Sequence, residues 1–215
     1  MRTNENLTRP TTGIDNRENT KESCRIELTE IPSVDRFPFH IKQTQSDFCI
    51  PASIEAVTRY FVPNSTVTQN YLWNTFVAAC AKQNMRPQDI SFKSIKELVI
   101  DNDSNFTWAE SRNIGGGELH SFEELSSVVR HSVDEGIPHM ISVPVRLPAI
   151  SRTLWHMLTT IGYDHLNLRV YDPDQSKQSP YDLPLAKLRA DLETLAHTSV
   201  TDSLVLRPKR NLNHD

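Results

Sequence analysis

The hydrophobic period of the chain changes from helical to strand-like near Gly136, and this change limits the fold more than any other feature of the sequence. Upstream of Gly136, apolar residues recur every three or four positions, as on one face of a helix, and downstream the period of β-strands prevails. We expect helices over residues 51–62, 66–79, 91–99, 121–135 and 182–197. We expect strands over residues 137–145, 154–163, 166–171 and 203–206. A helical half that precedes a sheet predicts an α+β domain with antiparallel strand pairing.

Local signals support three of the helix ends. Thr66 with Gln69 and Ser121 with Glu124 have the spacing of a capping box, in which each side chain bonds the other residue's backbone N–H. Gly136 can take the left-handed conformation that commonly ends a helix. These signals predict helix starts at Thr66 and Ser121 and a helix end at Gly136.

Length and composition suit one domain of 215 residues with its own core. Residues 1–25 are polar and are expected to form a mobile extension, residues 26–207 the domain, and residues 208–215 a polar tail. The formal net charge of −4 gives no electrostatic reason to expect a nucleic-acid partner, and no apolar run is long enough to span a membrane. The first residues lack the apolar core of a secretory signal, which predicts a cytoplasmic protein or one exported without a cleavable signal.

The three cysteines are an odd number without close spacing, which argues against both a disulfide framework and a structural zinc site. Cys80 lies in an apolar helical stretch and is expected to be buried. Cys24 has polar and charged neighbours and is expected to be exposed, without a catalytic role. We expect neither a cofactor nor a metal.

Cys49 opens an apolar helix, and Pro51 suits the first turn because a helix start needs no N–H there. The partial positive charge of a helix N-terminus favours thiolate over thiol, so Cys49 is the candidate nucleophile. Gln43, six positions upstream, can fold back and place its amide N–H beside the sulfur, forming an oxyanion hole with the Cys49 backbone N–H. Gln45 is the alternative for this role and is better explained as a solvated loop residue. Cys49 could instead be a small buried residue of the core.

His156 and Asp172 supply a candidate base and an orienting carboxylate. His156 lies within an expected strand, and Asp172 ends the next one. A short hairpin connection at Asp164-His165 would bring the two side chains together. The alternatives are a core histidine and a turn residue before Pro173. His139 has no acid at a hairpin-compatible distance, and the other histidines are expected at the surface or in loops: His40, His120, His131, His165, His197 and His214.

Three motifs resemble those of papain-like cysteine peptidases: Gln43-x5-Cys49-x-Pro51-Ala52-Ser53, His156 ahead of Gly162-Tyr163-Asp164, and Tyr171-Asp172-Pro173. The resemblance covers roughly residues 37–207. It is strongest to the bacterial branch that includes the domains which cut double-glycine leader peptides, and to their free-standing relatives. It implies a papain-like fold, with the nucleophile helix packed on an antiparallel sheet. It also implies that Cys49 is the nucleophile, His156 the general base and acid, Asp172 the residue that fixes the imidazole tautomer, and Gln43 the oxyanion donor.

The chain departs from that branch on both sides of the cysteine, with Phe48 before it and Ile50 in place of the usual glycine. The motifs therefore predict a cysteine-dependent amide hydrolase, or peptidase, with a protein or peptide as its substrate. Two alternatives stay open: a glutamine deamidase or acyl-transferase effector or toxin, and a peptide-binding module without catalysis. Gly115-Gly116-Gly117 is interpreted as a flexible loop rather than a self-cleavage motif.

Overall fold

A computed structural model describes residues 27–87, 90–114, 121–147, 152–193 and 202–209 of the chain. The predicted N-terminal extension, Cys24, the three consecutive glycines and most of the predicted C-terminal tail lie outside these ranges.

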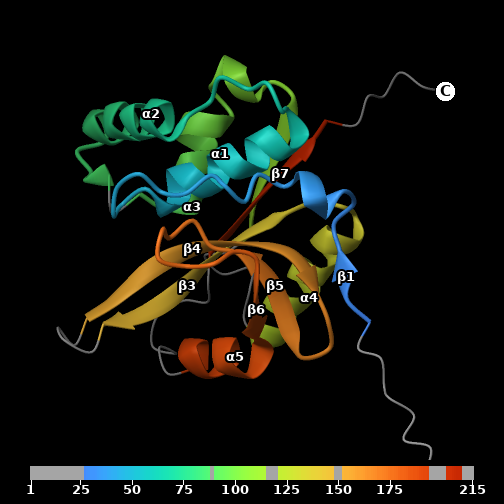
Figure 1. Ribbon diagram of the computed structural model, residues 1–215. Helices are drawn as coiled ribbons and strands as arrows, with labels where there is room; N and C mark the ends of the chain where they lie inside the picture. The colour runs from blue at the N-terminus through green and yellow to red at the C-terminus, as the bar shows by residue number, and fades with distance from the viewer. Residues whose placement is uncertain (1–26, 88–89, 115–120, 148–151, 194–201, 210–215) are drawn as a thin grey trace, which may run out of the picture.

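A seven-stranded sheet forms the centre of the molecule, and its strands run in the order β2-β7-β3-β4-β5-β6, with β1 paired to β4 (Figure 1). Every pairing among the described residues is antiparallel. The strands are β1 (Thr29–Glu30), β2 (Ala109–Ile114), β3 (His139–Leu147), β4 (Arg152–Tyr163), β5 (Asn167–Tyr171), β6 (Tyr181–Pro184) and β7 (Ser203–Pro208).

Helices cover both faces of this sheet. One face carries α1 (Cys49–Phe61), α2 (Gln69–Lys82) and α3 (Phe92–Ile95), which continues as a π-helical turn over Lys96–Ile100. The other face carries α4 (Phe122–Asp134) and α5 (Leu185–Glu193). Short 3₁₀ turns lie over Val34–Arg36 and Ser104–Phe106. The predicted α+β class, with the helix of Cys49 packed on an antiparallel sheet, is confirmed.

Alternation along the strands divides the core into two clusters. Met157 and Met140 belong to the cluster that includes α1 and α2, whereas their chain neighbours Leu158 and Ile141 belong to the cluster that includes α4 and α5. Successive side chains of a strand point to opposite faces, so the central strands β3 and β4 are apolar on both sides. This double burial fixes α1 against β4, the strand that carries His156.

The predicted ends of α4 are confirmed. Ser121 Oγ accepts a hydrogen bond from the Glu124 N–H at 3.1 Å, and Glu124 Oε2 accepts one from the Ser121 N–H at 3.1 Å. Gly136 has a φ of 77°. The Ile137 and Gly136 N–H groups donate to Ser132 O and Val133 O, each at 2.8 Å, which is the Schellman pattern.

Two predictions about elements are corrected. Thr68, not Thr66, caps α2, and its Oγ1 accepts a hydrogen bond from the Tyr71 N–H. The helix predicted from residue 182 begins only at Leu185, because Tyr181–Pro184 pairs with β5 as strand β6. Strand β2 was not predicted at all.

None of the helices in the described parts of the chain is both long and apolar enough to cross a membrane.

Candidate active site

Cys49 is the first residue of α1 and is partly buried against the cluster of α1 and α2. Phe48 precedes it as N-cap, is almost fully buried, and packs on Trp73 with ring centroids 5.0 Å apart. A phenylalanine side chain cannot accept the hydrogen bonds that a serine or aspartate cap would take from the first turn. The positive end of α1 is therefore left without a side-chain cap beside the thiol, where it favours a negative charge.

His156 and Asp172 meet across neighbouring strands. Strands β4 and β5 form the predicted hairpin, whose turn is held by Asp164 Oδ1 accepting hydrogen bonds from the Leu166 and Asn167 N–H groups. His156 Nε2 lies 2.7 Å from Asp172 Oδ1. Both side chains are shielded from water, with 18% of the imidazole and 4% of the carboxylate exposed.

Burial and charge act in opposite directions on the imidazole. Burial lowers the pKa of His156, but hydrogen bonds to Asp172 and Cys49, and the negative charges of both groups, raise it from 6.5 to about 9. The groups around His156 therefore favour the imidazolium form near neutral pH.

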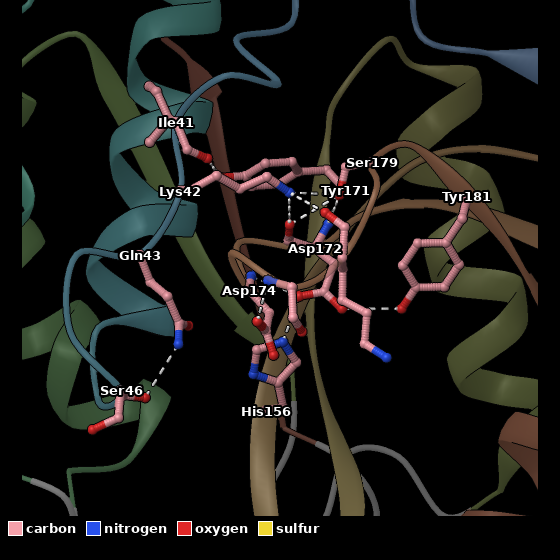
Figure 2. A network of polar contacts seen from close by, with 12 residues as sticks. Ile41, Lys42, Gln43, Ser46, His156, Tyr171, Asp172, Asp174, Ser179 and Tyr181 are labelled. Carbon is pink, nitrogen blue, oxygen red and sulfur yellow. Dashed lines mark hydrogen bonds and ion pairs between the residues drawn. The ribbon is translucent and has the colours of Figure 1, made fainter.

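Asp172 is itself held by several donors, as Figure 2 shows. Its Oδ1 also accepts from the Asp174 N–H at 2.9 Å, and its Oδ2 accepts from the Tyr181 hydroxyl at 3.2 Å. Its backbone N–H donates to Ser179 Oγ at 2.9 Å. Burial and the charge of Asp172 both raise the pKa of Tyr181, so the phenol stays protonated and remains a donor. Sequence reasoning missed Tyr181 and Ser179, because strand β6 and the turn before it were not predicted.

Gln43 lies in the loop that leads to α1, with its backbone tied to the segment after Asp172. The Gln43 N–H donates to Pro173 O at 2.8 Å, and Gln175 Nε2 donates to Gln43 O at 2.7 Å. The Gln43 side-chain amide donates to Ser46 O at 3.4 Å, a long hydrogen bond (Figure 2). The Gln43 amide therefore lies on Ser46 O, and the Gln43 backbone lies beside the segment that follows Asp172.

Gln69 of α2 also hydrogen-bonds the loop that leads to α1. Its Oε1 accepts from the Thr44 N–H at 3.0 Å, and its Nε2 donates to Lys42 O at 2.9 Å. The Gln69 N–H in turn donates to Glu55 Oε2 at 3.0 Å, which links α2 to α1. This role explains why Gln69 is not the partner of a Thr66 cap: its side chain bonds the loop. Gln45, the alternative oxyanion donor, is exposed.

The remaining candidates lie elsewhere. Cys80 is buried in the core, as predicted. His139 is fully buried, with Nδ1 2.9 Å from Ser132 Oγ; burial, followed by the charge of Arg112, lowers its pKa to about 3. His139 is therefore neutral, and its described hydrogen-bond partner is a hydroxyl rather than a carboxylate. Within the described ranges, no group of three His, Cys, Asp or Glu side chains is arranged to hold a metal ion.

Comparisons with known proteins bear on the fold. No family model matches the chain, and no curated protein sequence matches it. A crystal structure of a protein from Bacillus anthracis, described as a C39-like peptidase, has a similar fold, with a TM-score of 0.52 and 16% sequence identity. The match covers 85% of this chain and 100% of that one. At this identity the likeness establishes a C39-peptidase-like fold and nothing finer.

Proposed function

We propose that the protein is a cysteine-dependent amide hydrolase that cuts peptides or proteins, with Cys49 as nucleophile. The observation that carries this proposal is the 2.7 Å contact of His156 Nε2 with the buried Asp172 carboxylate, in an imidazole whose pKa is raised by Asp172 and by Cys49. A thiol at an uncapped helix start, an imidazole and a buried carboxylate form the set that nucleophilic catalysis by cysteine requires. The fold likeness to a C39-like peptidase supports the same class.

In the acylation step, the Cys49 thiolate attacks the carbonyl carbon of an amide and a carbon–sulfur bond forms. The negative charge that develops on the carbonyl oxygen is stabilised by the Cys49 backbone N–H and by the Gln43 side-chain amide, once it leaves Ser46 O. The imidazolium of His156 then gives its proton to the nitrogen of the leaving amine as the carbon–nitrogen bond breaks. The product is a thioester and a free amine.

In the deacylation step, neutral His156 takes a proton from water, and the resulting hydroxide attacks the thioester. Collapse of this second tetrahedral intermediate releases a carboxylic acid and restores the thiolate–imidazolium pair. Asp172 holds the imidazole in one orientation throughout both steps and stabilises its positive charge.

The test is to incubate a peptide library or proteome with the protein and to identify products by mass spectrometry. Peptides with a double-glycine leader are the first substrates to include, because of the motif resemblance. Wild type is expected to generate new peptide termini, and Cys49→Ala none. Gln43→Ala is expected to retain a residual rate, reduced about a hundredfold to a thousandfold by the loss of one oxyanion donor.

Cys80→Ala is the matched control, because it removes a buried thiol of α2 that has no part in the proposed chemistry, and it should leave the products unchanged. Conversion of glutamine to glutamate without new termini would show a deamidase instead. Identical product patterns for wild type and Cys49→Ala would contradict the proposal and leave a peptide-binding module.

A further inference from the structure

Lys42 joins the two loops of the candidate site through its ammonium group. Its Nζ donates to Asp172 O at 2.7 Å, to Lys177 O at 3.0 Å and to Ser179 Oγ at 3.2 Å (Figure 2). An ammonium group has three N–H donors, so these three acceptors use its full capacity. We call residues 172–180 the acid loop, because Asp172 begins it, and residues 42–48 the nucleophile loop, because it leads to Cys49.

Two further hydrogen bonds join the same loops directly beside Lys42. They are those of the Gln43 N–H with Pro173 O and of Gln175 Nε2 with Gln43 O. Lys42 also lies near the face of the Tyr171 ring, with Nζ 5.6 Å from its centroid. The two loops therefore meet in a hydrogen-bonded junction, with the ammonium group of Lys42 at its centre.

We propose that Lys42 is a positioning residue that locks the acid loop to the nucleophile loop, so that Asp172 keeps its place against His156. The proposal rests on the proposed function, and it assigns Lys42 no contact with substrate. Lys42 acts through the main chain of Asp172: the carbonyl that it binds belongs to the residue whose carboxylate meets the imidazole.

The acceptors around the half-buried ammonium group explain why a lysine is needed at position 42. Three acceptors converge on one point, and two of them are backbone carbonyl oxygens that no side-chain change can remove. Without the ammonium group these acceptors would lose a charge-assisted hydrogen bond, and water would have to enter the junction. Burial lowers the pKa of Lys42, while the charges of Asp172 and Asp174 oppose that shift. The contacts of the ammonium group therefore have to offset the free-energy cost of removing it from water.

The test is Lys42→Met, which keeps most of the apolar stem and removes the three donors. The readout is an NMR titration of His156 in full-length protein with ¹³Cε1-labelled histidine, assigned by the loss of its signal in His156→Gln. The charged groups that face this imidazole are Asp172, Cys49 and Asp174. If Asp172 moves away, the titration midpoint is expected to fall by about one unit or more.

The direction in which the His156 midpoint shifts distinguishes a positioning role of Lys42 from the electrostatic effect of losing its charge. Removing a positive charge near an imidazolium would by itself raise the midpoint, because less repulsion remains. Lys177→Met is the matched control, since it removes a charge from the exposed part of the same loop. Its midpoint is expected to stay in place or to rise. Lys42→Arg keeps the charge, but its planar fork fits three converging acceptors poorly, so an intermediate midpoint is expected.

On a cleavable substrate, Lys42→Met should lower kcat about tenfold or more with KM unchanged, because Lys42 acts on the catalytic groups alone. A midpoint in Lys42→Met that equals or exceeds the wild-type value would overturn the inference. If Lys42→Met does not fold, a wild-type midpoint in Lys42→Arg would overturn it equally. The two proposals can fail independently. A wild-type protein without Cys49-dependent products contradicts the hydrolase, whereas the His156 midpoint in Lys42→Met still tests whether Lys42 positions Asp172.

Discussion

At the scale of single residues, the chemistry of the site is decided at His156, where burial and charge compete. Burial opposes a positive imidazole, yet the carboxylate of Asp172 and the sulfur of Cys49 outweigh it. Tyr181 and the Asp174 N–H hold that carboxylate from behind, so it cannot turn away without breaking hydrogen bonds. In the proposed mechanism, this keeps the imidazole charged and able to donate a proton to the leaving amine.

The raised pKa of His156 makes a prediction about pH. Its folded-state pKa of about 9 exceeds the ordinary value of 6.5, so the charged imidazole stabilises the folded state fully below about pH 6.5. This stabilisation is lost as the pH rises through about 9. Asp172→Asn keeps the shape of the side chain but removes its charge. The difference in free energy of unfolding between wild type and Asp172→Asn should therefore narrow between neutral and strongly alkaline pH.

Urea unfolding of both proteins across that pH range measures the difference. His156→Gln serves as the control, because a protein without the imidazole should show no such narrowing when Asp172→Asn is added to it. A difference that stays constant across the range would contradict the pKa assigned to His156.

The site residues that lie at or near the ends of helices and strands could be predicted from the sequence. Cys49 begins a helix, Asp172 directly follows a strand, and His156 lies one hairpin away, so local pattern places all three. Lys42, Tyr181 and Ser179 could not be found in this way. Their roles depend on contacts between segments far apart in the chain, which no local spacing encodes.

At the scale of elements, α4 gives the clearest case of sequence specifying structure. Its capping box and Schellman end use side chains and a glycine whose local chemistry is visible in the sequence. Strands β2 and β6 are the opposite case. Each is an end of the strand order and has one neighbour, so pairing with β7 or β5 makes them strands without strong apolar alternation.

The capping box predicts a stability effect that is independent of the active site. Ser121→Ala removes the acceptor for the Glu124 N–H and should lower the free energy of unfolding by about 1 kcal/mol. Ser127→Ala, on the exposed side of the same helix, is the matched control and should cost less, since alanine is a good helix former. Chemical denaturation measures both. Equal effects of the two substitutions would contradict the role of the cap.

At the scale of the whole molecule, the two-sided sheet is what brings the site together. Strand β4 carries His156 and packs against α1 on one face and against α4 on the other. Strand β5 beside it ends at Tyr171, directly before Asp172, and Gln43 of the loop that leads to α1 hydrogen-bonds Pro173 next to that carboxylate. A chain with only 16% identity folds similarly, which indicates that the layer arrangement depends on pattern more than on particular residues.

The proposed mechanism requires that His156 activates the Cys49 thiol. The most direct measurement is the rate at which iodoacetamide labels Cys49 at about pH 6, followed by peptide mapping, in wild type and in His156→Gln. An unpaired thiol is mostly protonated at that pH and reacts slowly. We predict that Cys49 of wild type is labelled at least about tenfold faster than Cys49 of His156→Gln, and faster than glutathione under the same conditions. Equal rates at Cys49 in the two proteins would contradict the account.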